Sequence, residues 1–405
     1  MFAFSHHHYH LHRLAGFPEL FVAHGLRGLA EGLAAVFIPI FLLNLGYSFS
    51  DVFRYLMEYG LFWALLIYPS LKLGTRIGNG RWMGLSLIGN IILFILLISL
   101  PGHRWPLELL ALVAGAYTAM YWPFFRSSFA TLLAHRRTGR VVSVGSAVQT
   151  IAGGVAPAVG GIVATVFGVE AIQLVGLGLF TLAMIPLLTG PEFAKDQPFR
   201  VTRQTFHQHK RKFFANFAET YNDSSLYYVW PLFIFILIPS YAGVGILSSI
   251  MIFSSILVAV YVGRREESKG VRHYLKEGSA INSLGHLLRL GVSNAGQVTG
   301  INMVAGVGYS LYITPYNTAY YENIRRNGLG FLFGMQLFSA MAVVVIFGFL
   351  YLLSLSLAPR LCLVIALALA IPASYGIRLM RVPPPEQTTS VPQAAPSGRR
   401  RRATA

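Results

Sequence analysis

Apolar runs of about 20 residues recur along the whole chain and are separated by short polar turns. A helix of about 20 residues, rising 1.5 Å per residue, crosses a hydrocarbon core of roughly 30 Å. Of the 405 residues, 55% are hydrophobic and only 12% are charged, a composition that excludes an ordinary soluble domain. The sequence therefore predicts an all-α membrane protein with twelve transmembrane helices.

The net charge of +17 is unevenly distributed. Most Lys and Arg residues fall in alternate polar segments, at 72–81, 136–140, 195–212, 264–276, 325–326 and 378–402. This distribution is the positive-inside pattern, which marks cytoplasmic loops, and it argues against a nucleic-acid partner. We expect a multi-pass protein of the cytoplasmic (inner or plasma) membrane with both termini in the cytoplasm. Because the first apolar run is longer than the core of a signal peptide, we expect it to stay as the first helix.

The chain divides at its only long interior polar stretch, residues 189–212. The expected parts are a His-rich cytoplasmic tail (1–16), a six-helix bundle (17–188), a cytoplasmic linker (189–212), a second six-helix bundle (213–380) and a disordered basic tail (381–405). The expected spans are 19–45, 52–73, 82–100, 107–134, 141–167, 171–188, 213–238, 242–262, 279–296, a segment ending near 324, 329–353 and 360–379, with a charged loop at 263–276. The histidines of the first tail suit either a metal-binding tract or a disordered polar tail. The single cysteine, Cys362, excludes an internal disulfide.

A constant spacing of 192 residues links landmarks in the two predicted bundles. The landmarks are Pro39 and Pro231, Pro123 and Pro315, and Tyr117 and Tyr309. Independent landmarks that share one spacing indicate a duplicated six-helix unit. Each proline alone is compatible with a simple kink, whereas the matched set suggests hinges in helices that line a cavity.

Arg27 and Glu31 place two charges inside the first predicted span. Charges at this depth cost free energy and therefore tend to mark functional sites. The 192-residue spacing carries Arg27 onto Glu219 and Glu31 onto Asp223. Three roles remain open for these groups: proton coupling, which we place first, substrate binding, and static ion pairing between residues four apart.

Polar residues concentrate in the first and fourth span of each bundle, while the third, sixth and twelfth spans of the chain are almost free of charge. Because cavity-facing helices need polar side chains, we expect the polar spans to line a central site. The candidates for substrate or proton coupling are Arg27, Glu31, Glu219, Asp223 and Arg126. The candidate cavity residues are Tyr121, Trp122, Asn222, Tyr227, Asn302, Tyr309, Tyr316 and Asn317.

Some of these candidates have a second interpretation. The aromatic residues could instead belong to belts at the membrane interface, and Arg126 could extend to the inner surface rather than hold an anionic substrate. Span 279–296 is the least apolar and contains His286 and Arg289. His286 suits either a proton relay or a packed polar helix.

Small residues dominate the fifth span, where residues 152–161 read AGGVAPAVGG. This run resembles the Gly-x-x-x-Gly-Pro-x-x-Gly-Gly motif of the major facilitator superfamily, with alanines at both leading glycine positions, and the resemblance extends over roughly residues 17 to 380. Gly153, Pro157, Gly160 and Gly161 would let two helices approach closely and form a gate. The turn GTRIGNGR at 74–81 is similar to the family's Asp-Arg-x-Gly-Arg turn, with Gly74, Arg76 and Gly78 as gate candidates and Thr75 in place of the aspartate.

The resemblance implies two six-helix bundles that rock about a central site, and hence a secondary active transporter rather than an enzyme. We expect proton-coupled antiport of a small solute, with efflux of an amphipathic or aromatic compound, driven by a proton or sodium gradient. We expect no cofactor, no metal, and a monomer whose partners are the substrate and the bilayer. The alternatives are a facilitator or symporter for a nutrient such as a sugar or organic anion, and a polytopic membrane enzyme.

Overall fold

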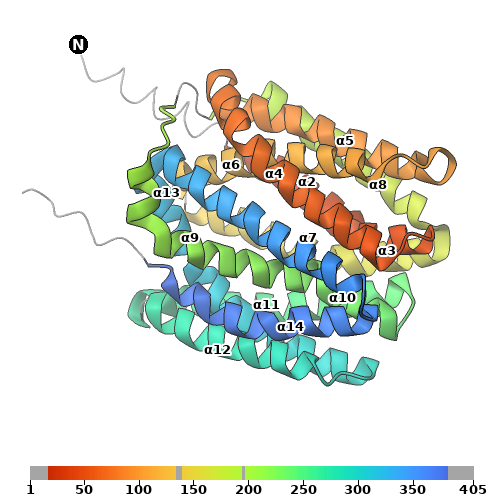
Figure 1. Ribbon diagram of the computed structural model, residues 1–405. Coiled ribbons are helices and arrows are strands. Elements are labelled where there is room, and N and C mark those ends of the chain that lie inside the picture. The colour runs from red at the N-terminus through yellow and green to blue at the C-terminus, as the bar shows by residue number, and fades with distance from the viewer. Residues whose placement is uncertain (1–16, 134–138, 194–196, 270, 382–405) are drawn as a thin grey trace, which may run out of the picture.

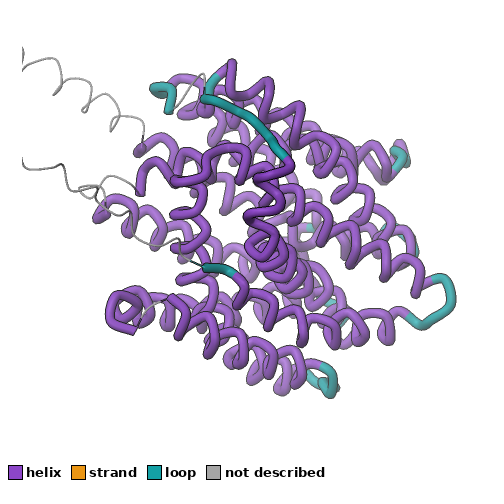
Figure 2. The backbone as a smooth tube through the Cα atoms, turned by 60° about the vertical axis from the view of Figure 1, so that its left-hand side comes forward, coloured by secondary structure: helices purple, strands orange, loops and turns teal. Residues whose placement is uncertain are grey.

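The computed structural model describes residues 17–133, 139–193, 197–269 and 271–381, without the side chains of 133–152, 257 and 259–269. Both predicted tails lie outside the described residues, apart from Arg381. Figure 1 shows helices that run side by side, with the first half of the chain (red to yellow) on one side and the second half (green to violet) on the other. Helices joined by short loops make up nearly all of this described part, which contains no strand (Figure 2).

The first half begins with a helix in three parts. The elements of this half are α2 (Phe17–Ala34), the 3-10 turn η1 (Ala35–Phe37), α3 (Ile38–Asn44), α4 (Phe49–Ile77), α5 (Asn79–His103), α6 (Leu107–Leu133), α7 (Gly139–Phe167) and α8 (Val169–Thr189). The elements of the second half are α9 (Arg203–Ser224), the π-turn η3 (Ser225–Val229), α10 (Trp230–Leu237), α11 (Tyr241–Lys269), α12 (Val271–Arg289), α13 (Ala295–Ser354), α14 (Pro359–Gly376) and η4 (Ile377–Leu379). The halves meet where α4 packs on α13 and α7 packs on α11.

Two predicted boundaries in the second half are wrong. The charged loop expected at 263–276 is largely helical, because α11 continues to Lys269 and α12 already begins at Val271. The span expected at 279–296 therefore ends at Arg289, and Asn294 starts the next helix by accepting a hydrogen bond of 3.0 Å from the Gln297 backbone. Lys, Arg and Glu are good helix formers, so charge alone does not end a helix.

The structure also extends a helix into the expected linker. Helix α9 begins at Arg203, ten residues before the predicted span, with Thr202 accepting a hydrogen bond of 3.2 Å from the Thr205 backbone as its N-cap. We use the term linker end for the end of the molecule at which this linker and the turn between α4 and α5 lie.

The four matched prolines behave as two pairs. Pro39 and Pro231 each stand at the start of a new helical segment, α3 and α10, directly after a 3-10 turn or a π-turn. Pro123 and Pro315 instead lie inside the continuous helices α6 and α13. The irregularity therefore recurs in the first helix of each half, as a duplicated unit predicts.

Six helices of the described part are long and apolar enough to cross a membrane. They lie at Pro18–Asn44, Asn79–His103, Leu107–Leu132, Val169–Thr189, Ala295–Ser354 and Pro359–Leu379. The 60-residue helix α13 has a break at Gly328, whose φ of 65° is in the left-handed region that glycine adopts freely. This break falls between the two spans predicted there. The chain is thus a multi-pass membrane protein, while the count of twelve spans stays a prediction.

Candidate functional site

Arg27 is almost completely buried in α2, with 1% of its side chain exposed, and forms an ion pair with Glu31. One guanidinium nitrogen lies 2.5 Å from a carboxylate oxygen of Glu31, one helical turn away. The guanidinium also lies over the rings of Tyr121 and Trp122 on α6, at 4.1 and 4.7 Å from their centroids. Cation–π contacts of this kind contribute more when both groups are desolvated. Glu31 keeps 26% of its side chain exposed, so the pair is open to a small ion on its carboxylate side.

A histidine that the sequence analysis did not select, His24, lies one turn before Arg27. Its Nδ1 atom lies 2.9 Å from the Tyr121 hydroxyl, and its ring stacks on Phe125 at 3.6 Å between centroids. Its position three residues before Arg27, on the same helix face, is the signal by which the sequence could have identified it. His24 and Arg27 together attach the middle of α2 to α6.

The second half has two acids at the equivalent positions of α9. Glu219 and Asp223 lie one helical turn apart and close enough for their charges to interact, and Tyr309 lies near Asp223. Thr220 donates a long hydrogen bond of 3.5 Å to Glu219. Two carboxylates that lie close together repel each other, so neighbouring acids of this kind favour the uptake of a proton by one of them.

Arg126 extends from α6 of the first half towards this acid pair. It donates a hydrogen bond of 2.7 Å to the Tyr320 hydroxyl on α13 and lies 4.9 Å from the centroid of the same ring. It is also close enough to Glu219 for their charges to interact. Arg126 thus points into the interface between the halves and not towards a membrane surface.

The predicted cavity residues separate into two groups. Tyr227 is 40% exposed, and together with Tyr309 it lies beside Asp223. The buried group is bonded inside the second half: Asn302 accepts from Trp230 (2.8 Å), Tyr316 donates to Asn216 (2.8 Å), and Asn222 accepts from Ser374 (2.7 Å). Asn317, on α13, is exposed. Periodicity identified these residues as helical, but the choice of face required the packed structure.

The glycines of α7 serve two different contacts. A Cβ at Gly160 would meet the backbone carbonyl of Leu33 in α2, within the first half. A Cβ at Gly161 would instead meet the carbonyl of Tyr241 at the start of α11, in the second half. The Pro157 carbonyl lies equally close to the Gly245 position of α11. These contacts place helices from both halves in backbone-to-backbone contact.

The turn between α4 and α5 is closed by an acid from the linker. Glu192 accepts hydrogen bonds from the backbone N–H groups of Gly80 (2.6 Å) and Arg81 (3.4 Å), at the N-terminus of α5. A carboxylate here is stabilised by the helix dipole. Gly78 has a φ of 116° beside this carboxylate. Thr75, which replaces the family's aspartate, only bonds its own helix at Lys72, and Gly74 packs against Phe124 and Trp82 while Arg76 is exposed.

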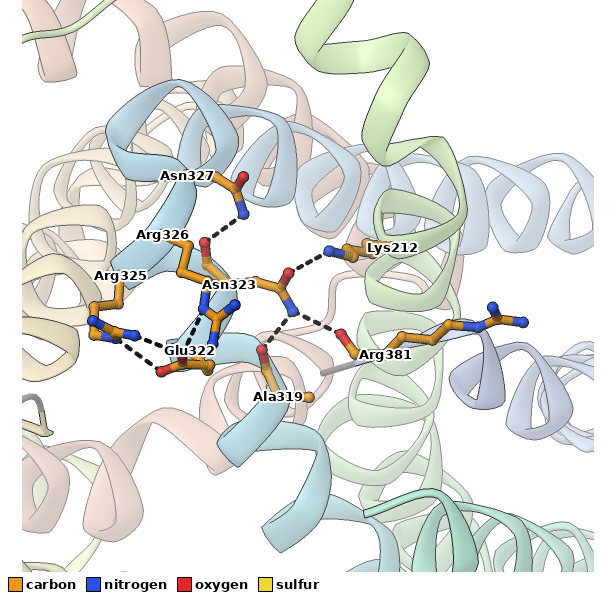
Figure 3. A network of polar contacts seen from close by, with 8 residues as sticks. All are labelled: Lys212, Ala319, Glu322, Asn323, Arg325, Arg326, Asn327 and Arg381. Atoms are coloured by element: carbon orange, nitrogen blue, oxygen red, sulfur yellow. Dashed lines mark hydrogen bonds and ion pairs between the residues drawn. The ribbon is translucent and has the colours of Figure 1, made fainter. Parts of the chain in front are cut away.

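A polar network surrounds the corresponding end of the second half (Figure 3). Lys212 of α9 donates to the side-chain oxygen of Asn323, whose amide nitrogen donates to the carbonyls of Ala319 (2.7 Å) and Arg381 (2.8 Å). Beside it, Glu322 accepts hydrogen bonds from Arg325 and Arg326, as Figure 3 shows. These contacts join the middle of α9 to the middle of α13 and the end of the described chain.

The halves also meet at the opposite end. Asn44 donates a hydrogen bond of 2.7 Å to Tyr241, and Ser354 donates one of 2.9 Å to Ser50. These two hydrogen bonds join the halves at the end opposite the linker end.

Comparison with protein families agrees with this architecture. A family model described as Major Facilitator Superfamily matches residues 20–390. The chain belongs to this superfamily. No curated protein sequence matches this member of the superfamily.

Solved structures of major facilitator transporters share the fold. A mutant of the nucleoside transporter NupG has a TM-score of 0.66 at 12% identity, with 89% of this chain and 98% of that chain covered. The human organic anion transporter MFSD10 has a TM-score of 0.64 at 12% identity, with 90% of this chain and 99% of that chain covered. A POT family transporter in complex with a thioalcohol-conjugated peptide has a TM-score of 0.66 at 13% identity, with 89% of this chain and 94% of that chain covered. At these identities the likeness concerns the fold alone.

Proposed function

We propose that this protein is a proton-coupled secondary active transporter that moves a small solute by alternating access. The observation that carries this proposal is the acid pair of Glu219 and Asp223, which faces Arg126 from the other half. A carboxyl pair in a site of low polarity takes up or releases a proton when a nearby cation moves. Membership of a transporter superfamily argues against the membrane-enzyme alternative.

Movement of the halves changes the surroundings of the acid pair. Arg126 belongs to α6, whereas Glu219 and Tyr320, which accepts a hydrogen bond from Arg126, belong to the second half. Separation of α6 from α13 withdraws the cation, which favours the protonated pair, and the return of the cation favours release. The proton load is then linked to which side of the membrane the site faces.

The solute we propose is amphipathic or aromatic. Tyrosines from both halves surround the charged groups, among them Tyr59 and Tyr117 near Glu31 and Tyr227 near Asp223. Rings with a polar edge suit a solute of mixed character. Efflux is the direction we favour. Arg27 and Arg126 lie close to these acids and tyrosines. Because both arginines are positively charged, they favour a symporter for an organic anion as the second candidate function.

We also propose the cytoplasmic membrane as the location, with the linker end inside the cell. This orientation follows from the excess of Lys and Arg at 195–212, 325–326 and the other polar segments of that side. It places the network of Figure 3 on the cytoplasmic surface.

The test begins with a thermal-shift screen of nucleosides, short peptides, organic anions and aromatic amines on the purified protein, because a ligand that binds the folded state raises the melting temperature. The hit is then assayed in proteoliposomes. A pH difference of one unit should give about tenfold accumulation at one proton per solute. Glu219→Gln and Asp223→Asn should retain counterflow at equal pH but lose this accumulation.

Glu108→Gln is the matched control, because Glu108 is an exposed acid that pairs with Arg54 away from the site. Accumulation that persists in both site variants with unchanged pH dependence would contradict proton coupling. Accumulation driven by a sodium gradient alone would show that the coupling ion is sodium and not the proton. Transport in the opposite direction would favour the nutrient symporter.

A further inference from the structure

Arg289 is a fully buried cation inside the second half. It is the last residue of α12, with no exposed side-chain surface, and its guanidinium lies 4.8 Å from the centroid of the Trp230 ring. Its Nη1 atom lies 3.3 Å from Nδ1 of His286, and Nη2 lies 3.6 Å from the sulfur of Met251. Within the described part of the chain, no Asp or Glu forms an ion pair with it. Burial of an arginine without a counter-charge is costly.

His286 does not supply the missing negative charge and cannot share the positive one. Asn222 donates its amide N–H to the Ala218 carbonyl at 2.8 Å, which directs its side-chain oxygen towards His286 at 3.0 Å. That oxygen only accepts, so Nε2 of His286 carries the proton and Nδ1 accepts from Arg289. His286 is therefore a neutral imidazole, and the charge on Arg289 remains uncompensated.

Two donors next to this charge have no partner. Nε of Arg289 and the hydroxyl of Tyr312 are both buried and without a hydrogen bond in the described part. Tyr312, on α13, is itself fully buried and close enough to Arg289 for their charges to interact. The neighbouring Trp230 and Asn302 bond each other at 2.8 Å, so they provide no free acceptor. Unpartnered buried donors beside a net positive charge call for an acceptor that is itself an anion.

We propose that Arg289 and Tyr312 bind a small monovalent anion of the halide class, with chloride as the cellular ion, between α12 and α13. The carbonyl groups at the end of α12 offset only part of the positive charge. A bound water would satisfy the two donors but would leave that charge in place. Because the site lies within the second half and not between the halves, a monatomic anion suits it better than a transported solute. The proposal is independent of the proposed transport function.

The test measures halide binding to the full-length purified protein. The melting temperature is followed while sodium gluconate is replaced by sodium chloride or bromide at constant ionic strength. Wild type should show a saturable rise of about 3 °C. Arg289→Met should lose the rise, and in gluconate it should melt no lower than wild type, because the uncompensated charge is gone. Arg360→Met is the control, because Arg360 is an exposed arginine near Phe233. This variant should keep the halide-dependent rise in melting temperature.

Two further measurements make the outcome decisive. Tyr312→Phe removes only the hydroxyl, so it should raise the halide concentration at half effect several-fold even if Arg289→Met fails to fold. A bromide soak should place an anomalous scattering peak beside Nε of Arg289. A melting temperature that is independent of halide, an unchanged halide response in Tyr312→Phe, or water alone at Nε would each overturn the proposal.

Discussion

The two halves carry opposite chemistry at equivalent positions of their first helices. In the first half Arg27 and Glu31 form an ion pair within α2, so the charges balance locally. In the second half Glu219 and Asp223 are two neighbouring acids, and the nearby cation, Arg126, comes from the first half. The pair in the first half is balanced within one helix, whereas in the proposed mechanism the acid pair responds to the relative position of the halves. Duplication thus supplied one scaffold, and divergence gave each copy a different role.

A second comparison concerns the two buried arginines. Both follow a buried histidine by three residues and lie on a tryptophan, Arg27 on Trp122 and Arg289 on Trp230. Only Arg27 has a carboxylate one turn further along its helix. The same motif is therefore complete in one half and lacks its anion in the other, which is the basis for the halide site proposed above.

The largest expected effect comes from breaking the balanced pair. Glu31→Gln leaves Arg27 buried without its counter-charge and should lower the free energy of unfolding by about 2–3 kcal/mol. The equivalent change in the second half, Glu219→Gln, removes one of two neighbouring acids that repel each other when charged. It should change the free energy of unfolding by less than about 1 kcal/mol. Thermal unfolding in detergent compares the two variants.

The double variant Arg27→Met with Glu31→Leu is the control for this comparison, because it removes both charges and should regain most of the lost stability. Equal losses in Glu31→Gln and Glu219→Gln would mean that the two halves do not differ in charge balance.

An intermediate effect is expected from the glycines of α7. Gly160→Ala introduces a methyl group against the Leu33 carbonyl and should destabilise the first half by about 1–3 kcal/mol. Gly161→Ala meets the Tyr241 carbonyl across the interface and should reduce transport more than stability. Gly153→Ala is the matched control, since among the described residues no atom lies within 4 Å of its Cβ position. A loss in Gly153→Ala as large as in Gly160→Ala would attribute the effect to helix propensity instead.

The smallest effect concerns Lys212 at the linker end, just before the predicted span 213–238. Burial, together with the neighbouring Arg326, lowers the pKa of Lys212. At pH values between the pKa of Lys212 in the folded protein and its pKa in the unfolded chain, the unfolded chain binds more protons than the folded protein. The free energy of unfolding should therefore rise with pH across that range. Lys212→Met should flatten this rise, by about 0.3 kcal/mol because the group is partly screened by water. Unfolding at pH 8 and pH 10 measures it, with the exposed Lys210→Met as control; an equal change in both variants would disprove the assignment to Lys212.

Much of the fold followed from local patterns. The apolar runs predicted nearly every helix, and the break at Gly328 falls where the tenth and eleventh spans were expected to meet. The errors lie at 263–276 and 279–296, where charge suggested a loop. Helices extend into water beyond the membrane, so hydropathy records where a helix becomes polar and not where it ends.

The candidate site was predicted less completely. The spacing of 192 residues identified Glu219 and Asp223 as counterparts of Arg27 and Glu31, but not that their nearby cation is Arg126 of the first half. Tyr316 and Asn302 were selected as cavity residues and lie in the bonded interior of the second half. Glu192, His24 and Tyr312 entered only with the structure, because their partners are distant in the chain.

The sequence by itself determined that this is a helical, duplicated membrane protein with charges buried in its first and seventh predicted spans, because hydropathy, charge and spacing are properties of the chain alone. Only the tertiary structure decided how those charges are paired. Arg126 reaches the second half through Tyr320, 194 residues away in the chain. Arg289 forms no ion pair with a carboxylate in the described part of the chain, although the sequence contains fifteen acids. Pairing depends on which helix faces meet, and that is set by packing between segments far apart in the chain.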